Sequence, residues 1–210
     1  DGSATYRWED CSSSVIYPLN NNRSELITNI NGLRTGGYTA GQTGIAWGWY
    51  TISPFWKNLW PSSSEPGPYN DYDVKKFAII MTDGDFNTHY DLENWSKKEC
   101  EKEKKKKDYY GDSLYRGKCK KGKNDYWVER ASGGYWGESS KRARKICDNM
   151  KKDDIQIYTI YFGSNNSSGG AKVMQYCASE GAYYQATSTE KLIKAFGNIA
   201  KKIQAIYLAK

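Results

Sequence analysis

The residues best placed to do chemistry lie where an apolar segment ends in Thr82, Asp83 and Gly84. The segment before them, 77–81, is apolar and contains two β-branched isoleucines, a pattern typical of a strand buried on both faces of a parallel sheet. In open α/β sheets, the loops that leave the carboxyl ends of the strands form the ligand-binding crevice. Held there on a glycine turn, the Asp83 carboxylate could bind a hard cation or act as a nucleophile.

Periodicity along the chain predicts the elements that must position Asp83. Apolar residues at helical spacing predict a helix that begins with Ser24 as N-cap and stops at residues 31–32 or just after. The same spacing predicts helices over 42–53, 138–152 and 171–179, and from Ser188 to about residue 203. Apolar and β-branched runs predict strands over 75–82, 155–162 and 182–186. Because strands alternate with helices, we expect an α/β fold, a Rossmann-like parallel sheet flanked by helices.

The predicted sheet is short of strands. Three strands are few for a doubly wound domain, and helices precede the first of them. We therefore expect the first strand or strands to be missing from this chain. The length of 210 residues suits one domain, 1–210, which we expect to be N-terminally incomplete.

A stretch from about residue 85 to 136 has almost no apolar periodicity, and we interpret it as an insertion. The chain has 31 Lys and Arg against 24 Asp and Glu, and most of the excess lies at 97–123. Within it, 97–107 has the composition of a charged helical arm that includes Lys104, Lys105, Lys106 and Lys107. These lysines could bind an anionic surface or nucleic acid by releasing counterions. Because glutamates dilute the run, a solvated face is the favoured interpretation, and nucleic acid is not the expected partner.

Five cysteines without C-x-x-C spacing, and a single histidine, His89, argue against a zinc site. We expect an oxidising compartment and two disulfides, Cys147 with Cys177 across neighbouring helices and Cys100 with Cys119 inside the insertion. Cys11 is then left over, and buried free thiols are the alternative. No apolar run approaches the ~18 residues that cross a bilayer, so a targeting segment for export would lie outside this chain.

Several short motifs, taken in order, resemble the von Willebrand factor type A domain, and more narrowly the TadG-like proteins of tight-adherence (Tad) pilus assembly. The resemblance covers about residues 5 to 207 except the insertion, and it is carried by the segments 37–39, 51–54, 79–84, 146–151, 157–162, 177–178, 182–184 and 192–203. It implies a non-enzymatic adhesion module, exported to the bacterial periplasm, cell envelope or cell surface. Its partner would be a pilus or surface protein that contacts the strand-tip face, and no small-molecule substrate is expected.

The same resemblance implies a metal-binding site. In that family a divalent ion, usually Mg²⁺, is held by three loops, of which Thr39 matches the second and Asp83 the third. Oxygen donors of this kind suit a hard cation that keeps several waters. The first loop has no match, because Asp1, Ser3 and Thr5 have its spacing but no apolar strand precedes them. The Mg²⁺ site is therefore incomplete in this chain, and Asp83 as a turn cap and Thr39 as a turn hydroxyl remain alternatives.

An enzymatic interpretation competes with this one. Asp83, Asp85 and Asn87 follow an apolar strand at a spacing that resembles the Asp-x-Asp-x-Thr motif of haloacid-dehalogenase-type phosphatases. In that motif the first aspartate attacks phosphorus and the second is the general acid. The motif normally opens its domain and has Thr at the fifth position, whereas here a long segment precedes it and Asn87 stands in that place. We therefore expect no enzymatic activity.

Aromatic residues gather between positions 47 and 60. They could form an exposed adhesive patch, but a helix-packing stripe is the favoured interpretation. The residues are Trp47, Trp49, Phe55, Trp56 and Trp60.

Overall fold

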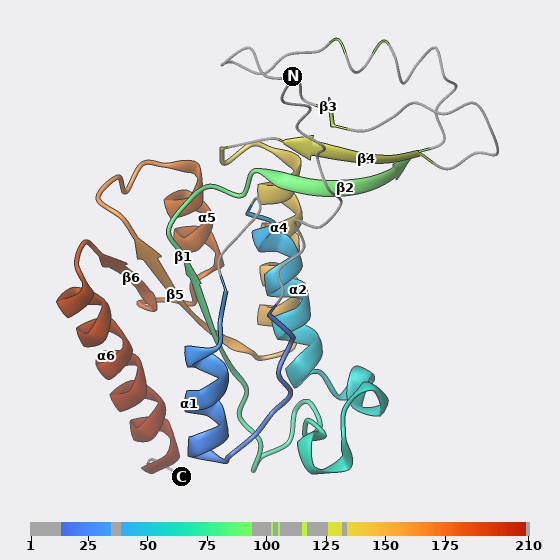
Figure 1. Cartoon of the computed structure of the whole chain (residues 1–210). Helices are drawn as coiled ribbons and strands as arrows, with labels where there is room; N and C mark the ends of the chain where they lie inside the picture. The colour runs from blue at the N-terminus through green and yellow to red at the C-terminus, as the bar shows by residue number, and fades with distance from the viewer. Residues whose placement is uncertain are drawn as a thin grey trace.

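The computed structural model describes residues 14–34, 39–93, 102, 105, 115–116, 126–131 and 134–208. Its centre is a three-stranded parallel sheet in the order β1-β5-β6, formed by Phe77–Thr82, Gln156–Phe162 and Tyr183–Ala186. Helices flank the sheet, so the fold is α/β, as predicted from the sequence (Figure 1). The carboxyl ends of all three strands therefore lie at one edge of the molecule.

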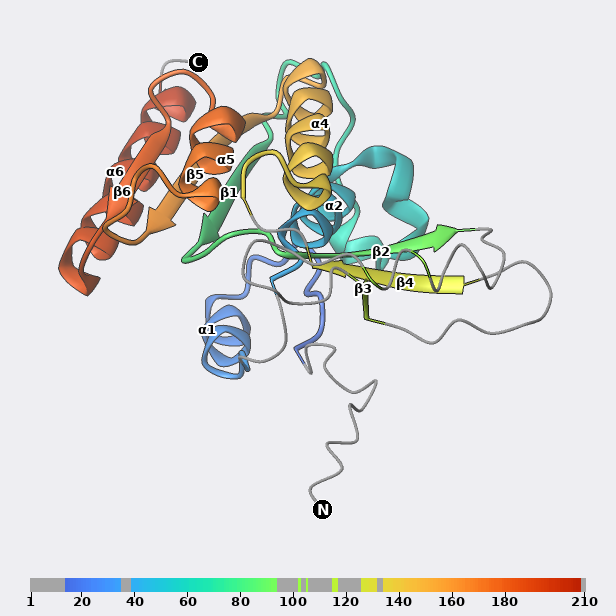
Figure 2. The ribbon, with the colours of Figure 1, turned by 90° about the horizontal axis from the view of Figure 1, so that it is seen from above.

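Two apolar layers sandwich the middle strand. On one face of β5, Ile157 and Tyr161 pack with α2 (Gly41–Ile52), α4 (Glu138–Lys152) and α5 (Gly169–Cys177). On the other face, Tyr158 and Ile160 pack with α6 (Thr189–Leu208). The alternation along β5 follows from the two-residue period of a strand, and both sets of side chains are buried. Seen from above, α4 and α5 lie on the opposite side of β1 from α1 (Arg23–Asn31) (Figure 2).

The prediction that β1 is buried on both faces is wrong. Ala78 and Ile80 pack toward α2, α4 and α5, but on the other face Ile79 is 45 % and Met81 is 51 % exposed. β1 is an edge strand in the described part of the chain, where its only partner is β5, and α6 lies over β5 and β6 instead. Whether further strands cover this edge stays a prediction.

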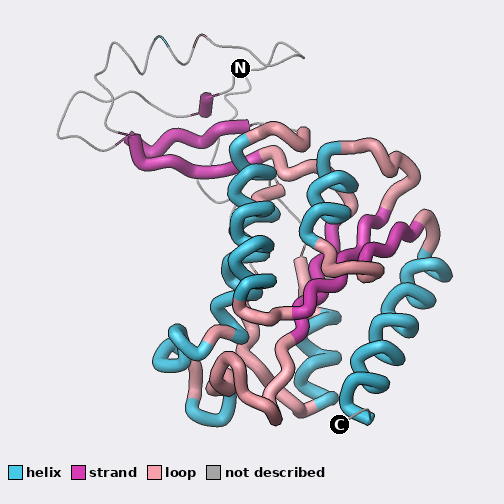
Figure 3. The backbone as a smooth tube through the Cα atoms, turned by 180° about the vertical axis from the view of Figure 1, so that it is seen from behind, coloured by secondary structure: helices cyan, strands magenta, loops and turns pink. Residues whose placement is uncertain are grey.

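The insertion contains more order than its sequence predicts. β2 (Thr88–Glu93), β3 (Tyr115–Arg116) and β4 (Tyr126–Ala131) form a second, antiparallel sheet in the order β2-β4-β3. The β2-β4 pair projects from the helical body (Figure 3). Of the lysine run, Lys105 is exposed in a turn, whereas Lys104, Lys106 and Lys107 lie outside the described residues.

Helix boundaries differ slightly from the predicted ones, for local reasons. Asn22, and not Ser24, is the N-cap of α1, because its Oδ1 accepts the backbone N–H groups of Ser24 and Glu25. At α6 the predicted cap is present, since Ser188 Oγ accepts the N–H of Lys191 at 3.3 Å. Pro54 ends α2 as expected, and the chain continues into two 3₁₀ helices, η1 (Pro54–Leu59) and η2 (Ser62–Ser64). No helix in the described ranges has the length and apolarity needed to span a membrane.

A disulfide joins α4 to α5. Cys147 and Cys177 are fully buried and bonded, with their Cα atoms 5.2 Å apart, in the pairing expected from the sequence. The expected pairing of Cys100 with Cys119, and the position of Cys11, lie outside the described residues.

Candidate functional site

The loop that follows β1 begins with a hydroxyl-stabilised turn. Thr82 is buried, and its Oγ1 both accepts the N–H of Gly84 at 3.3 Å and donates to the Gly84 carbonyl at 3.2 Å. The turn holds the backbone on either side of Asp83, whose side chain is exposed. A carboxylate is thus presented to solvent at the carboxyl end of a parallel strand, where ligands bind in this class of fold.

Phe86 anchors the loop to α2. Its side chain is only 1 % exposed, and it belongs to the core shared by α2, α4 and α5. Gly41, the first residue of α2, packs directly on the ring, so that a Cβ there would overlap it. The helix N-terminus therefore requires glycine at this position, and the contact fixes the loop three residues after Asp83.

Asp85 anchors the same loop to α5. Its Oδ1 accepts the backbone N–H of Gly170, in the first turn of that helix. A carboxylate at a helix N-terminus is stabilised by the exposed N–H groups and the helix dipole. The backbones meet closely here, because a Cβ on Gly170 would lie 2.8 Å from the carbonyl carbon of Gly84. Asp83 therefore lies two residues before one anchor, Asp85, and three residues before the other, Phe86.

Thr39 lies on the segment that borders this loop. Its backbone N–H donates to Asn87 Oδ1 at 3.0 Å, and its carbonyl accepts the N–H groups of Asn87 and Thr88. Gln42 strengthens the link by donating its Nε2 to the Thr88 carbonyl at 2.7 Å. The structure therefore joins the segment of Thr39 to the loop of Asp83 through Asn87, with Thr39 half-buried and Asp83 exposed.

The oxygen donors at this loop are of the kind that a hard cation binds, but there are few of them. Thr39 and Asp83 offer a hydroxyl and a carboxylate oxygen, which Mg²⁺ accepts. Within the described ranges no group of three or more His, Cys, Asp or Glu side chains is placed to hold a metal ion. An ion bound here would take its remaining ligands from water and from another molecule.

The phosphatase interpretation assigns Asp85 the role of general acid. In the structure the Asp85 carboxylate accepts the N–H of Gly170, which is a structural contact. A hollow of about 300 Å³ lies at the other end of β5, where it is lined by Lys151, Ile155 and Ser179 among others. His89 is in β2, and its side chain lies outside what the structure describes.

The aromatic residues between 47 and 60 divide into packed and exposed ones. Trp49 donates its Nε1 to the Tyr69 hydroxyl at 2.9 Å and packs against the core, as a helix stripe would. On η1, however, Phe55 is 83 % and Trp56 is 38 % exposed. Trp56 nevertheless stacks on Tyr50 of α2, with the ring centroids 4.1 Å apart. The favoured interpretation as a packing stripe therefore holds for Trp49 and Trp56 but not for Phe55.

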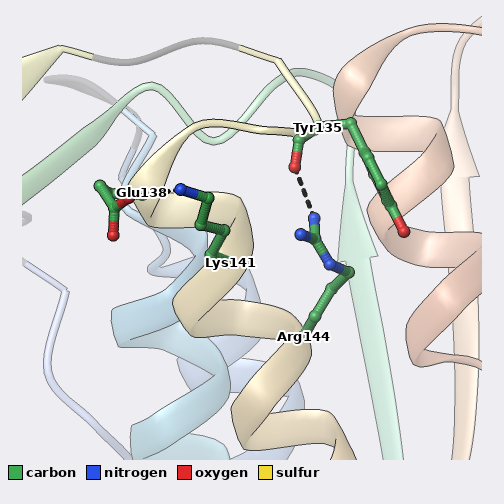
Figure 4. A network of polar contacts seen from close by, with 4 residues as sticks. All are labelled: Tyr135, Glu138, Lys141 and Arg144. Atoms are coloured by element: carbon green, nitrogen blue, oxygen red, sulfur yellow. Dashed lines mark hydrogen bonds and ion pairs between the residues drawn. The ribbon is translucent and has the colours of Figure 1, made fainter.

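One cluster of residues near the carboxyl ends of the strands was not identified from the sequence. Residues 134–136 lie against the start of α5, because a Cβ on Gly169 would overlap the backbone of Gly134. There the Arg144 guanidinium lies 3.9 Å from the Tyr135 ring centroid and donates to the Tyr135 carbonyl (Figure 4). The neighbouring Trp136 is 76 % exposed. The sequence contains one signal for this cluster, which is an aromatic pair between glycines directly before a helix rich in basic residues.

Comparisons of the chain with protein-family models, with curated proteins and with solved structures find no match.

Proposed function

We propose that this chain is a non-enzymatic, exported binding module of a bacterial surface or pilus-assembly system, which contacts a partner protein through the loop after β1. The observation that carries the proposal is the exposed Asp83 carboxylate on a loop anchored by Phe86 and Asp85. A site fixed before binding loses little conformational entropy when the partner arrives. The Cys147–Cys177 disulfide supports the assignment to an oxidising compartment.

In this proposal Mg²⁺ assists the contact. Thr39 and Asp83 would supply protein oxygens, water would fill further positions, and a carboxylate of the partner would complete the shell. Because two protein ligands alone hold Mg²⁺ weakly, the affinity for the ion in the absence of a partner should be low.

Metal binding is tested by following the backbone amides near the loop in NMR spectra during titration with millimolar Mg²⁺. The Gly84 and Asn87 amides should shift, and Asp83→Asn should abolish the shifts. Asp73→Asn is the matched control, because Asp73 is an exposed aspartate on a different loop and its replacement should change nothing. If the amides of wild-type protein do not move, the metal part of the proposal is wrong.

The protein contact is tested by placing a photo-crosslinking residue at position 83, or at position 73, in cells that produce the protein. We expect a discrete crosslinked envelope protein from position 83 only, and excess unlabelled chain should compete with it. The same preparations are assayed with a general phosphatase substrate. Turnover that Asp83→Asn abolishes would replace the binding proposal with the phosphatase one.

A further inference from the structure

The exposed side of α4 and α5 combines positive charge with aromatic residues. α4 contains six basic residues against two acidic ones, in a chain whose formal net charge is +7. Lys141, Lys145 and Lys152 are exposed on α4, and Lys172 is exposed on α5. Together with Trp136, Arg144 and Tyr176, these four lysines form what we call the basic–aromatic surface.

The aromatic part of this surface is held in place by the fold. Arg144 lies over the rings of Tyr135 and Tyr176, 3.9 and 5.7 Å from their centroids. Tyr176 is held by its side chain and by its backbone. Its hydroxyl donates to Asp148 at 3.0 Å, and its backbone carbonyl accepts a hydrogen bond from the Lys151 ammonium group at 2.8 Å. Such contacts leave few rotamers to lose on binding.

The residue types of the cluster are those that dominate binding energy between proteins. Trp, Tyr and Arg are enriched among interface hot spots, where flanking contacts exclude water. Trp136 is 76 % exposed and Tyr176 is 41 % exposed, although large aromatic side chains are normally covered. The cluster therefore has an anchor, Trp136, that is mostly open to solvent, with the Tyr135 ring 4.9 Å from it on one side.

The lysine spacing indicates the form of the partner. Lys141 and Lys145 are one helical turn apart, a rise of about 6 Å. Carboxylates on one face of an extended peptide are two residues and about 6.6 Å apart, which matches this spacing. Lys152 lies a further seven residues along the same helix face, a rise of about 10.5 Å, and this distance does not equal a two-residue or four-residue step of an extended chain. An extended segment with alternating acidic residues can thus pair with Lys141 and Lys145, while Lys152 adds positive charge farther along.

Carboxylates within the surface favour a polypeptide over nucleic acid. Glu138 contacts Lys141 at 2.7 Å (Figure 4). Asp148 lies between Lys145 and Lys152 along the helix. A nucleic acid carries a charge at every phosphate, so it would meet these carboxylates at close range. A peptide can place its acidic residues opposite the lysines and neutral ones elsewhere.

We infer that the basic–aromatic surface binds an extended acidic segment of another protein, with Trp136 as the apolar anchor. This surface does not include Asp83, so the inference goes beyond the proposed function and can fail independently of it.

The test uses the full 210-residue chain and a fluorescein-labelled 14-residue peptide in which Glu alternates with Ser and Leu, so that the peptide carries both negative charge and apolar side chains. Binding is followed by fluorescence anisotropy at several salt concentrations. We expect binding that weakens as salt rises. Lys145→Glu with Lys152→Glu should raise the Kd about tenfold, because each reversal removes an attraction and adds a repulsion. Trp136→Ala should also weaken binding, with the salt dependence unchanged. The matched control is Lys194→Glu with Lys201→Glu, two exposed lysines on α6, which should leave the Kd within twofold.

Three results would overturn the inference. One is an equal loss of affinity in the α6 control, which would mean that only net charge is sensed. Another is an unchanged Kd in Trp136→Ala. The third is tighter binding of a 14-nucleotide single strand than of the peptide at the same salt, which would make the surface a nucleic-acid site. Circular dichroism of each variant confirms that these surface changes leave the fold intact.

Discussion

Gly170→Ala should destabilise the protein although alanine is the better helix former. A Cβ at this position would lie 2.8 Å from the carbonyl carbon of Gly84 and closer still to its oxygen. Both are backbone atoms, so no flexible side chain can move aside. The loop after β1 must then shift away from α5, and the hydrogen bond from the Gly170 N–H to Asp85 is stretched or lost.

The magnitude follows from three terms. Overpacking costs about 1–3 kcal/mol, and losing a hydrogen bond to a charged acceptor costs about 1.5–3 kcal/mol. The higher helix propensity of alanine relative to glycine offsets about 1 kcal/mol of this loss in stability. The net loss in the free energy of unfolding should be about 2–4 kcal/mol, which lowers the urea midpoint by about 1 M for a slope near the upper end of the usual range.

A second glycine supplies the control for this measurement. Gly44, on α2, has nothing within 4 Å of its ideal Cβ, so Gly44→Ala should raise stability by about 0.5–1 kcal/mol. Both variants are unfolded in urea at neutral pH with tryptophan fluorescence as the signal. If Gly170→Ala proves as stable as Gly44→Ala, the close approach of α5 to the Asp83 loop is wrong.

Replacing both Cys147 and Cys177 with Ala should lower the free energy of unfolding by about 3–4 kcal/mol, because the bridge spans a sequence separation of 30 residues; an unchanged urea midpoint would contradict this. Ile79→Lys should cost less than about 1 kcal/mol and reduce light scattering at high concentration, since this side chain is exposed on an edge strand; a loss of several kcal/mol would mean that the face is covered. Stability should fall above about pH 10, because folding raises the pKa of four tyrosines, so that the folded state retains protons that the unfolded state has released. Burial is the main cause of the raised pKa for three of them, and the hydrogen bond to Asp148 for Tyr176; they are Tyr69, Tyr158, Tyr183 and Tyr176. A urea midpoint that stays constant while tyrosinate absorbance rises would refute the last expectation.

Elements whose apolar residues follow one clear period are the ones that the sequence predicts well. In α4 the buried residues Ala143, Cys147 and Met150 repeat at helical spacing, and the predicted bounds coincide with the observed ones. β5 is a run of mostly apolar, β-branched and aromatic residues between polar turns, and its middle residues are buried on both faces. β1 has the same kind of run, yet one face is open, because burial depends on what lies beside a strand and not on the strand alone.

The strands of the insertion illustrate the opposite case. β2 has the sequence Thr-His-Tyr-Asp-Leu-Glu, which alternates over five residues only, and β4 has Tyr-Trp-Val-Glu-Arg-Ala, which does not alternate. Its pairing with β4 joins Thr88 to Ala131 across more than forty residues of charged and glycine-rich sequence. Backbone hydrogen bonds create such a pair, and they leave little trace in side-chain pattern.

The candidate site depends on contacts of this long-range kind. Asp85 and Gly170 are 85 positions apart, and in the sequence the glycine is equally compatible with a loop or a helix start. Only the folded backbone shows that the residue must lack a side chain in order to reach Gly84. The sequence could therefore identify Asp83 as the exposed carboxylate at a strand end, but it could not identify what holds it. Because Phe86 packs on α2 and Asp85 binds the first turn of α5, any change that separates either helix from the sheet should also displace Asp83.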